Sequence, residues 1–132
     1  MKVLLVEDSG ILGEAIRDHL EAMGHAVVWC ATLGEACVTS GAGGFGVVLL
    51  DLRLPDGSGL SLLRALRQAS DTVPVMVLTA FDQISDQMEA LRCGANDFLT
   101  KPFSLSCLAQ RVITIDRQSS PDPAGAAHAL FD

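Results

Sequence analysis

Short apolar runs, each ending on a polar side chain, constrain the fold of this 132-residue chain more than any other feature. The runs are VLLV before Glu7 and Asp8, VVLL before Asp51, VPVMVL before Thr79, and the weaker DFLT before Lys101. Strands of a parallel sheet covered on both faces need such continuous apolar sequence, because neither side of the strand meets water. A fifth run, HAVVWC at 25–30, has no polar residue of this kind at its end. The sequence therefore predicts five buried strands.

Segments with helical spacing separate these runs, and they include residues 11–24, 58–69, 84–94 and 104–115. Strands that alternate with helices are typical of the α/β class with right-handed crossovers. We predict a flavodoxin-like, doubly wound, five-stranded parallel sheet of order 2-1-3-4-5 with five helices. The pattern ends near residue 117, so residues 1–117 are predicted to form one domain. Residues 118–132, rich in Pro, Ala, Gly and Ser, are predicted to be a linker or flexible C-terminal tail.

Charge and composition exclude several classes of function. A net charge of −7 repels phosphate backbones, so we expect no direct nucleic-acid binding by this domain. No apolar run approaches the roughly 18 residues of a membrane span, which favours a cytoplasmic protein without membrane contact. The four cysteines lack CxxC spacing and are predicted to be small buried thiols, not a disulfide framework or a zinc site. The single tryptophan, Trp29, is interpreted as a core residue.

The predicted strand order brings the polar strand ends together. The first and third strands are neighbours in this order, so Glu7, Asp8 and Asp51 converge at the carboxyl edge of the sheet, and Thr79 and Lys101 arrive from the strands beyond. Three carboxylates in one place repel one another and need a cation among them. Mg²⁺ suits such a site because it binds carboxylate oxygens and leaves positions for phosphate oxygens. The sequence therefore predicts a magnesium site.

This cluster indicates phosphoryl chemistry, because a carboxylate can attack phosphorus to form an acyl phosphate. Asp51 is the candidate nucleophile since it stands alone at its strand end, whereas Glu7 and Asp8 are better placed to hold metal. Lys101 would neutralise charge on the phosphoryl group and the Thr79 hydroxyl would donate to it. Taken singly, each residue has an ordinary structural explanation, such as a helix-entry acid, a turn acid, a capping hydroxyl or a surface lysine. Their joint placement at strand ends favours a site.

The stretches VLLVEDS, VVLLDLRLPDGSGL, VMVLTA and GANDFLTKPF resemble the receiver domain of two-component response regulators over residues 2–117. The resemblance implies a signalling phosphoacceptor, not an enzyme, that receives its phosphoryl group from a sensor histidine kinase. It implies these roles: Asp51 as phosphoacceptor, Glu7 and Asp8 as metal-binding acids, the backbone carbonyl of Arg53 as a further metal ligand, Thr79 and Lys101 as phosphoryl contacts, and Phe98 as the aromatic switch. It also implies a cis bond between Lys101 and Pro102.

The phrases DLRLPDGSGL and KPFSLSCLAQRV are similar to the OmpR-type transcriptional subfamily, in which a winged-helix DNA-binding domain follows a linker. No such domain is present in these 132 residues. The resemblance places the switching surface on the fourth helix, fifth strand and fifth helix, where charged pairs join two copies. Asp97 and Arg111 match these charges, but Gln87 and Cys107 stand where charged residues are usual. The resemblance therefore implies a weak homodimer.

Two other functions remain as alternatives. One is a receiver-like interaction module that works without phosphorylation, which loss of the site residues would favour. The other is a metal-dependent phosphatase, which needs a second acid near Asp51 as general acid or base. Leu52 and Arg53 follow Asp51 directly, and the next acid along the chain, Asp56, lies beyond a turn. The resemblance also places Arg53 and Phe81 beside the path of a hydrolytic water. Neither residue positions water well, so we expect slow self-dephosphorylation.

Overall fold

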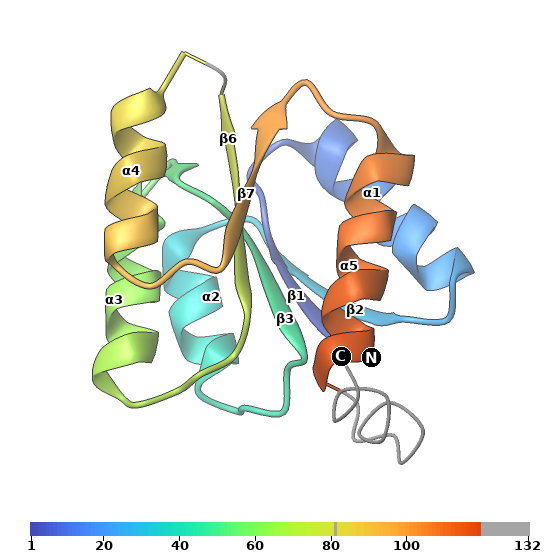
Figure 1. Cartoon of the computed structure of the whole chain (residues 1–132), viewed down its shortest axis with the longest axis horizontal. Helices are drawn as coiled ribbons and strands as arrows, with labels where there is room; N and C mark the ends of the chain where they lie inside the picture. The colour runs from blue at the N-terminus through green and yellow to red at the C-terminus, as the bar shows by residue number, and fades with distance from the viewer. Residues whose placement is uncertain (81, 120–132) are drawn as a thin grey trace, which may run out of the picture.

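The computed structural model describes residues 1–80 and 82–119 (Figure 1). Seven strands are present in this part of the chain: β1 (Lys2–Val6), β2 (Ala26–Cys30), β3 (Val47–Asp51), β4 (Arg53–Leu54), β5 (Gly57–Ser58), β6 (Val75–Ala80) and β7 (Asp97–Lys101). The helices are α1 (Gly10–Ala22), α2 (Leu33–Ser40), α3 (Leu60–Gln68), α4 (Ile84–Arg92) and α5 (Leu105–Ser119).

Five of the strands form one parallel sheet in the order β2-β1-β3-β6-β7. Because β6 and β7 are the fourth and fifth strands of this sheet, the order confirms the predicted 2-1-3-4-5 arrangement. The strand without a polar end, β2, is at the edge, and β1 and β3 are adjacent. The remaining strands, β4 and β5, pair antiparallel as a short hairpin where the sequence had suggested only a turn.

The central strands β1, β3 and β6 are buried on both faces, as their continuous apolar sequence predicted, whereas the edge strands β2 and β7 are only partly buried. One layer of core packs strand residues such as Leu4, Leu50 and Val77 against α2, α3 and α4. The opposite layer packs Leu5 and Leu49 against α1 and α5. Figure 1 shows the same division, with α2, α3 and α4 on one side of the sheet and α1 and α5 on the other. This doubly wound arrangement leaves the carboxyl ends of the strands as the edge where side chains can converge.

The described part of the chain covers the predicted domain and little of the predicted tail. Helix α5 continues to Ser119, two residues past the boundary at 117, and residues 120–132 lie outside the described residues, as does Phe81. No helix in the described ranges is long and apolar enough to cross a membrane.

All four cysteines are free, in keeping with the missing CxxC spacing. The prediction that they are buried is wrong for Cys37 and Cys107, which lie exposed on α2 and α5. Cys30 is buried and Cys93 is half-buried. The exposed pair occupies the outer surface of amphipathic helices, where the core makes no demand on residue type.

Candidate functional site

Lys101, at the end of β7, joins two carboxylates from different strands. Its Nζ donates to Glu7 Oε1 at 2.6 Å and to Asp51 Oδ2 at 3.0 Å. Glu7 is 0% exposed and Asp51 is 5% exposed, whereas the lysine side chain retains 27% of its exposure. Glu7 lies 94 positions and Asp51 50 positions before Lys101 in the sequence. The fold therefore brings distant residues into one charged cluster at the carboxyl edge of the sheet.

Asp8 completes an acidic group with these two carboxylates. Glu7, Asp8 and Asp51 each place one carboxylate oxygen within 4.8 Å of the others. Asp8 is exposed and its backbone N–H donates to Glu7 Oε2 at 3.0 Å, while Asp51 Oδ1 accepts the backbone N–H of Arg53 at 3.0 Å. An oxygen-only donor set with one solvent-facing member fits a hard divalent cation that keeps some of its waters. The predicted acids thus form a pocket that can hold a metal ion.

Burial and neighbouring charge shift the titration of this cluster. Burial, together with a hydrogen bond to Asp51, raises the pKa of Glu7 to about 7, although the hydrogen bond from Lys101 opposes both effects. Burial by itself lowers the pKa of Lys101, but the hydrogen bond to Glu7 and the charge of Asp51 outweigh it, so the lysine pKa is raised. Lys101 is therefore cationic at neutral pH, and Glu7 exchanges a proton in the neutral range.

Thr79 and Phe98 lie on the strands next to this cluster. Thr79 is buried on β6, and its hydroxyl donates to the carbonyl of Ala80 at 3.4 Å. In the sheet register Thr79 pairs with Thr100, beside Lys101. Phe98 lies on β7, half-buried against the core layer of α2, α3 and α4. The Lys101–Pro102 peptide bond is cis, as the resemblance implied.

The loop after Asp51 is tied to two helices. The Arg53 guanidinium donates to Asp86 Oδ2 of α4 at 3.0 Å, so its side chain is already paired away from Asp51. Asp56 accepts the first two amides of α2, from Leu33 at 2.7 Å and Gly34 at 2.9 Å. These bonds lower the pKa of Asp56, the Gly34 amide having the larger effect. Both oxygens of Asp56 are therefore engaged at α2.

Comparison with known proteins decides the family. The family described as "Response regulator receiver domain" matches residues 3–113. The chain belongs to this receiver-domain family. It is similar to the swarming motility regulation protein RssB of Serratia marcescens, 44% identical over 118 residues that cover 89% of this chain and 54% of that protein. It is also similar to the transcriptional regulatory protein PmrA of Pectobacterium parmentieri, 40% identical over 90% of this chain and 54% of that protein.

Solved structures agree with this assignment. The receiver domain of the Francisella response regulator 1452 superposes with a TM-score of 0.84 at 30% identity, covering 90% of this chain and 98% of that one. The non-phosphorylated HemR receiver domain of Leptospira biflexa gives a TM-score of 0.82 at 34% identity, covering 92% and 97%. The chain spans about half the length of the curated relatives that it matches. Receiver domains of this family are signalling phosphoacceptors that work with sensor histidine kinases.

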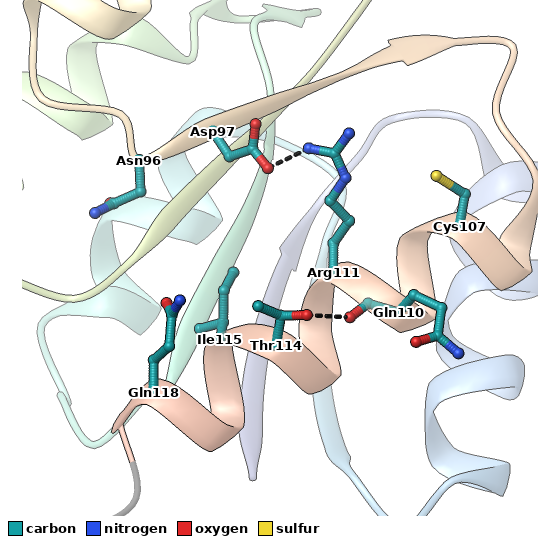
Figure 2. A pocket seen from close by; sticks show the side chains of 8 residues that line it. All are labelled: Asn96, Asp97, Cys107, Gln110, Arg111, Thr114, Ile115 and Gln118. Atoms are coloured by element: carbon teal, nitrogen blue, oxygen red, sulfur yellow. Dashed lines mark hydrogen bonds and ion pairs between the residues drawn. The ribbon is translucent and has the colours of Figure 1, made fainter. Parts of the chain in front are cut away.

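The family resemblance placed the switching surface on the fourth helix, fifth strand and fifth helix. In this structure these elements are α4, β7 and α5. Figure 2 shows Arg111 of α5 reaching the Asp97 carboxylate of β7 beside a pocket of about 410 Å³ that Cys107 also lines. Gln87 itself is largely buried, with 9% of its surface exposed. Three apolar residues of α4, Ile84, Met88 and Leu91, are exposed alongside the polar Ser85 and Arg92.

Two residues next to the site were missed from the sequence. Asp86 pairs with Arg53 across 33 positions, and no local pattern marks a pair joined only by the tertiary fold. Trp29 packs half-buried against the core layer of α1 and α5, in line with its interpretation as a core residue, but its indole N–H also donates to the Glu7 carbonyl at 2.8 Å, which was not predicted. The sequence did hold a signal for this contact, because Trp29 stands one residue before the end of β2. In the parallel pairing of β1 with β2, Trp29 lies opposite Leu5, close to the end of β1.

Proposed function

We propose that Asp51 accepts a phosphoryl group from the phosphohistidine of a sensor kinase. The observation that carries the proposal is the Lys101 ammonium held between the buried carboxylates of Glu7 and Asp51. A cation fixed beside a carboxylate nucleophile is positioned to neutralise charge that develops on a transferring phosphoryl group. The membership of the receiver-domain family supports the same assignment.

In the proposed step an Asp51 carboxylate oxygen attacks phosphorus as the P–N bond to the kinase histidine breaks. The electron pair of that bond goes to the imidazole nitrogen, and the product is an aspartyl phosphate. Lys101 stabilises the negative charge on the phosphoryl oxygens, and the Thr79 hydroxyl turns from the Ala80 carbonyl to donate to one of them. Phe98 then rotates inward as the proposed aromatic switch.

We propose Mg²⁺ as the cofactor, held by Glu7, Asp8 and Asp51 and by the backbone carbonyl of Arg53. The oxygen donors of the three acids and the exposure of Asp8 support this choice. When bound, Mg²⁺ supplies positive charge that offsets carboxylate repulsion and the charge of the phosphoryl oxygens. Glu7 must lose its proton for such binding, because a protonated carboxyl is a poor ligand.

A phosphatase is the weaker reading of the same residues. It needs a second acid that is free to act as general acid or base. Glu7 and Asp8, the acids beside Asp51, are proposed to hold the metal, and both oxygens of Asp56 are bonded to amides of α2. We expect slow self-dephosphorylation, because Arg53 is paired with Asp86 and an arginine does not act as a general base. An interaction module that works without phosphorylation has no specific observation in its favour, since the predicted acids and Lys101 come together.

We propose that the kinase docks beside Lys101. A pocket of about 340 Å³ lined by Leu12, Lys101, Pro102 and Phe103 adjoins the site, and the neighbouring Ile11 is 88% exposed. An apolar side chain left in water near the Lys101 pocket suits a partner that must bring a phosphohistidine to the site. Ile11→Ser is expected to slow transfer from a phosphorylated histidine kinase while labelling by acetyl phosphate is unchanged.

We propose that this receiver works in the cytoplasm as part of a transcription regulator, without binding nucleic acid itself. Its relatives include proteins named as transcriptional regulatory proteins, and the chain carries a net charge of −7. Phosphorylation is proposed to shift α4, β7 and α5 and to favour a weak homodimer through them. The Asp97–Arg111 pair and the exposed apolar residues of α4 support this surface.

The phosphoacceptor is tested by intact-mass measurement after incubation with acetyl phosphate and Mg²⁺. One added phosphoryl group is expected on the parent protein and none on Asp51→Asn. Asp56→Asn is the matched control, because it changes an acid five residues away in the same loop and should still be labelled. Equal labelling of Asp51→Asn would refute the assignment.

A further inference from the structure

The indole of Trp29 completes the hydrogen bonding at the end of β1. The Glu7 backbone N–H donates to the Cys30 carbonyl at 3.1 Å, which extends the pairing of β1 with β2. The Glu7 carbonyl instead accepts the Trp29 Nε1–H at 2.8 Å. A side chain of β2 therefore supplies the hydrogen bond at the point where β1 leaves the sheet. A buried carbonyl without such a donor would be costly.

This bond holds one side of the peptide group between Glu7 and Asp8. The other side of the same peptide is held as well, because the Asp8 N–H donates to Glu7 Oε2 at 3.0 Å. A peptide group is planar, so fixing its oxygen and its N–H fixes its orientation. The direction in which the chain enters Asp8 is thereby set, although Asp8 itself is exposed.

The ring is seated firmly enough to serve as a fixed donor. A Cβ added at Gly13 of α1 would lie 2.2 Å from the nearest ring atom of Trp29, so the indole packs directly on the helix backbone. The Arg17 guanidinium lies over the same ring, 5.6 Å from its centroid. The indole thus spans from α1 to the loop that carries the two acids.

We propose that Trp29 is a positioning residue for the acid pair, acting through its indole N–H on the Glu7–Asp8 peptide. It touches neither metal nor phosphoryl group. Its effect on the loop is independent of any ligand, and its effect on metal binding rests on the proposed function. Trp29→Phe keeps an aromatic ring and removes the donor, whereas Arg17→Lys is the matched control that changes a neighbour of the same ring and keeps its charge.

The first measurement uses metal-free protein. Water–amide exchange by NMR is expected to be about fivefold faster at Asp8 in Trp29→Phe than in the parent, from the loss of one hydrogen bond, and unchanged in Arg17→Lys. An unchanged Asp8 exchange rate in Trp29→Phe overturns the inference, whether or not the protein binds metal.

The second measurement is a Mg²⁺ titration followed by amide shifts. The dissociation constant is expected to rise about tenfold in Trp29→Phe and to stay within about twofold in Arg17→Lys, as for other residues that orient metal ligands. The parent protein alone gives a further test. During its Mg²⁺ titration, the indole N–H signal of the single tryptophan should shift with the same midpoint as the Asp8 amide signal. An indole signal that does not follow the Asp8 amide in a parent that binds Mg²⁺ overturns the inference. A parent without any Mg²⁺ response overturns the proposed function, and the Asp8 exchange rate then decides on Trp29.

Discussion

Replacing Glu7 by glutamine is predicted to remove a pH dependence that is built into the metal-free fold. Burial raises the pKa of Glu7 to about 7 in the folded protein, above the ordinary value of 4.5 that applies to the unfolded chain. The folded state therefore binds a proton more tightly than the unfolded state does. For this group, stability is fully present below pH 4.5 and is lost as the pH rises through 7. The proposed Mg²⁺ would act in the opposite direction, because a metal ion binds the ionised carboxylate.

The size of the effect follows from the two pKa values. Ionising a carboxyl whose pKa is raised from 4.5 to about 7 costs about 3 kcal/mol in all, of which about 2.5 kcal/mol falls between pH 5 and pH 8. The amide of Glu7→Gln does not titrate, so the free energy of unfolding of the variant should exceed that of the parent increasingly over this range. Titrating groups that do not contact Glu7 are the same in both proteins and cancel in the difference.

Urea unfolding at pH 5, 6, 7 and 8 in a chelating buffer measures this difference directly. Glu14→Gln, which makes the same change on the exposed surface of α1, is the matched control. With millimolar Mg²⁺ added, the parent should gain stability at pH 8 and little at pH 5, and Glu7→Gln should gain much less at either pH. A difference between parent and Glu7→Gln that is flat from pH 5 to pH 8 would show that burial does not raise the pKa of Glu7.

Three further predictions concern the loop after β3. Gly59→Ala places a Cβ 2.3 Å from the Asp51 carbonyl oxygen, so thermal melting should show a loss of about 1–3 kcal/mol, while Gly10→Ala, in open space, should melt like the parent. Asp56→Asn removes an ionised acceptor from the start of α2, so urea unfolding should show a lower free energy of unfolding than the parent has at neutral pH. The difference between the two proteins should shrink on acidification, because the pKa of Asp56 is lowered in the folded state and its stabilising effect is lost as the pH falls. Arg53→Asn should shorten the lifetime of the aspartyl phosphate after donor removal, since an amide can orient water; equal decay rates would contradict this.

The sheet and the convergence of its polar ends could be predicted because both follow from local sequence and a topological rule. Continuous apolar runs identify buried strands, and alternation with helices fixes a parallel order whose carboxyl ends share one edge. Glu7, Asp51 and Lys101 meet there as expected. The family resemblance gave the cis bond before Pro102, which no periodicity could have indicated.

What the sequence left undetermined depends on tertiary packing. The burial of Gln87 follows from how α4 is rotated on the sheet. The apolar residues of this short helix do not specify that rotation, because Ile84, Met88 and Leu91 are exposed. The pairing of Arg53 with Asp86 depends on the distance between the loop after β3 and α4. The position of the Trp29 ring depends on its close packing against Gly13 of α1. The β4–β5 hairpin is too short to show alternation.

The hydrogen-bond lengths around Asp51 indicate which member of the site moves when charge is added. The three acids and Lys101 leave two negative charges uncompensated when Glu7 is ionised. The proposed Mg²⁺ would balance these charges, and the proposed phosphoryl group on Asp51 would then add new anionic oxygens. Lys101 is already held by bonds of 2.6 and 3.0 Å, so it can meet this charge with little displacement. The Thr79 hydroxyl is held only by a 3.4 Å contact to Ala80, well beyond the usual O–H···O length of about 2.8 Å, and it loses little on leaving. We therefore expect Thr79 to be the member of the site that responds, and we propose that its movement is passed from β6 to the paired strand β7, which carries Phe98.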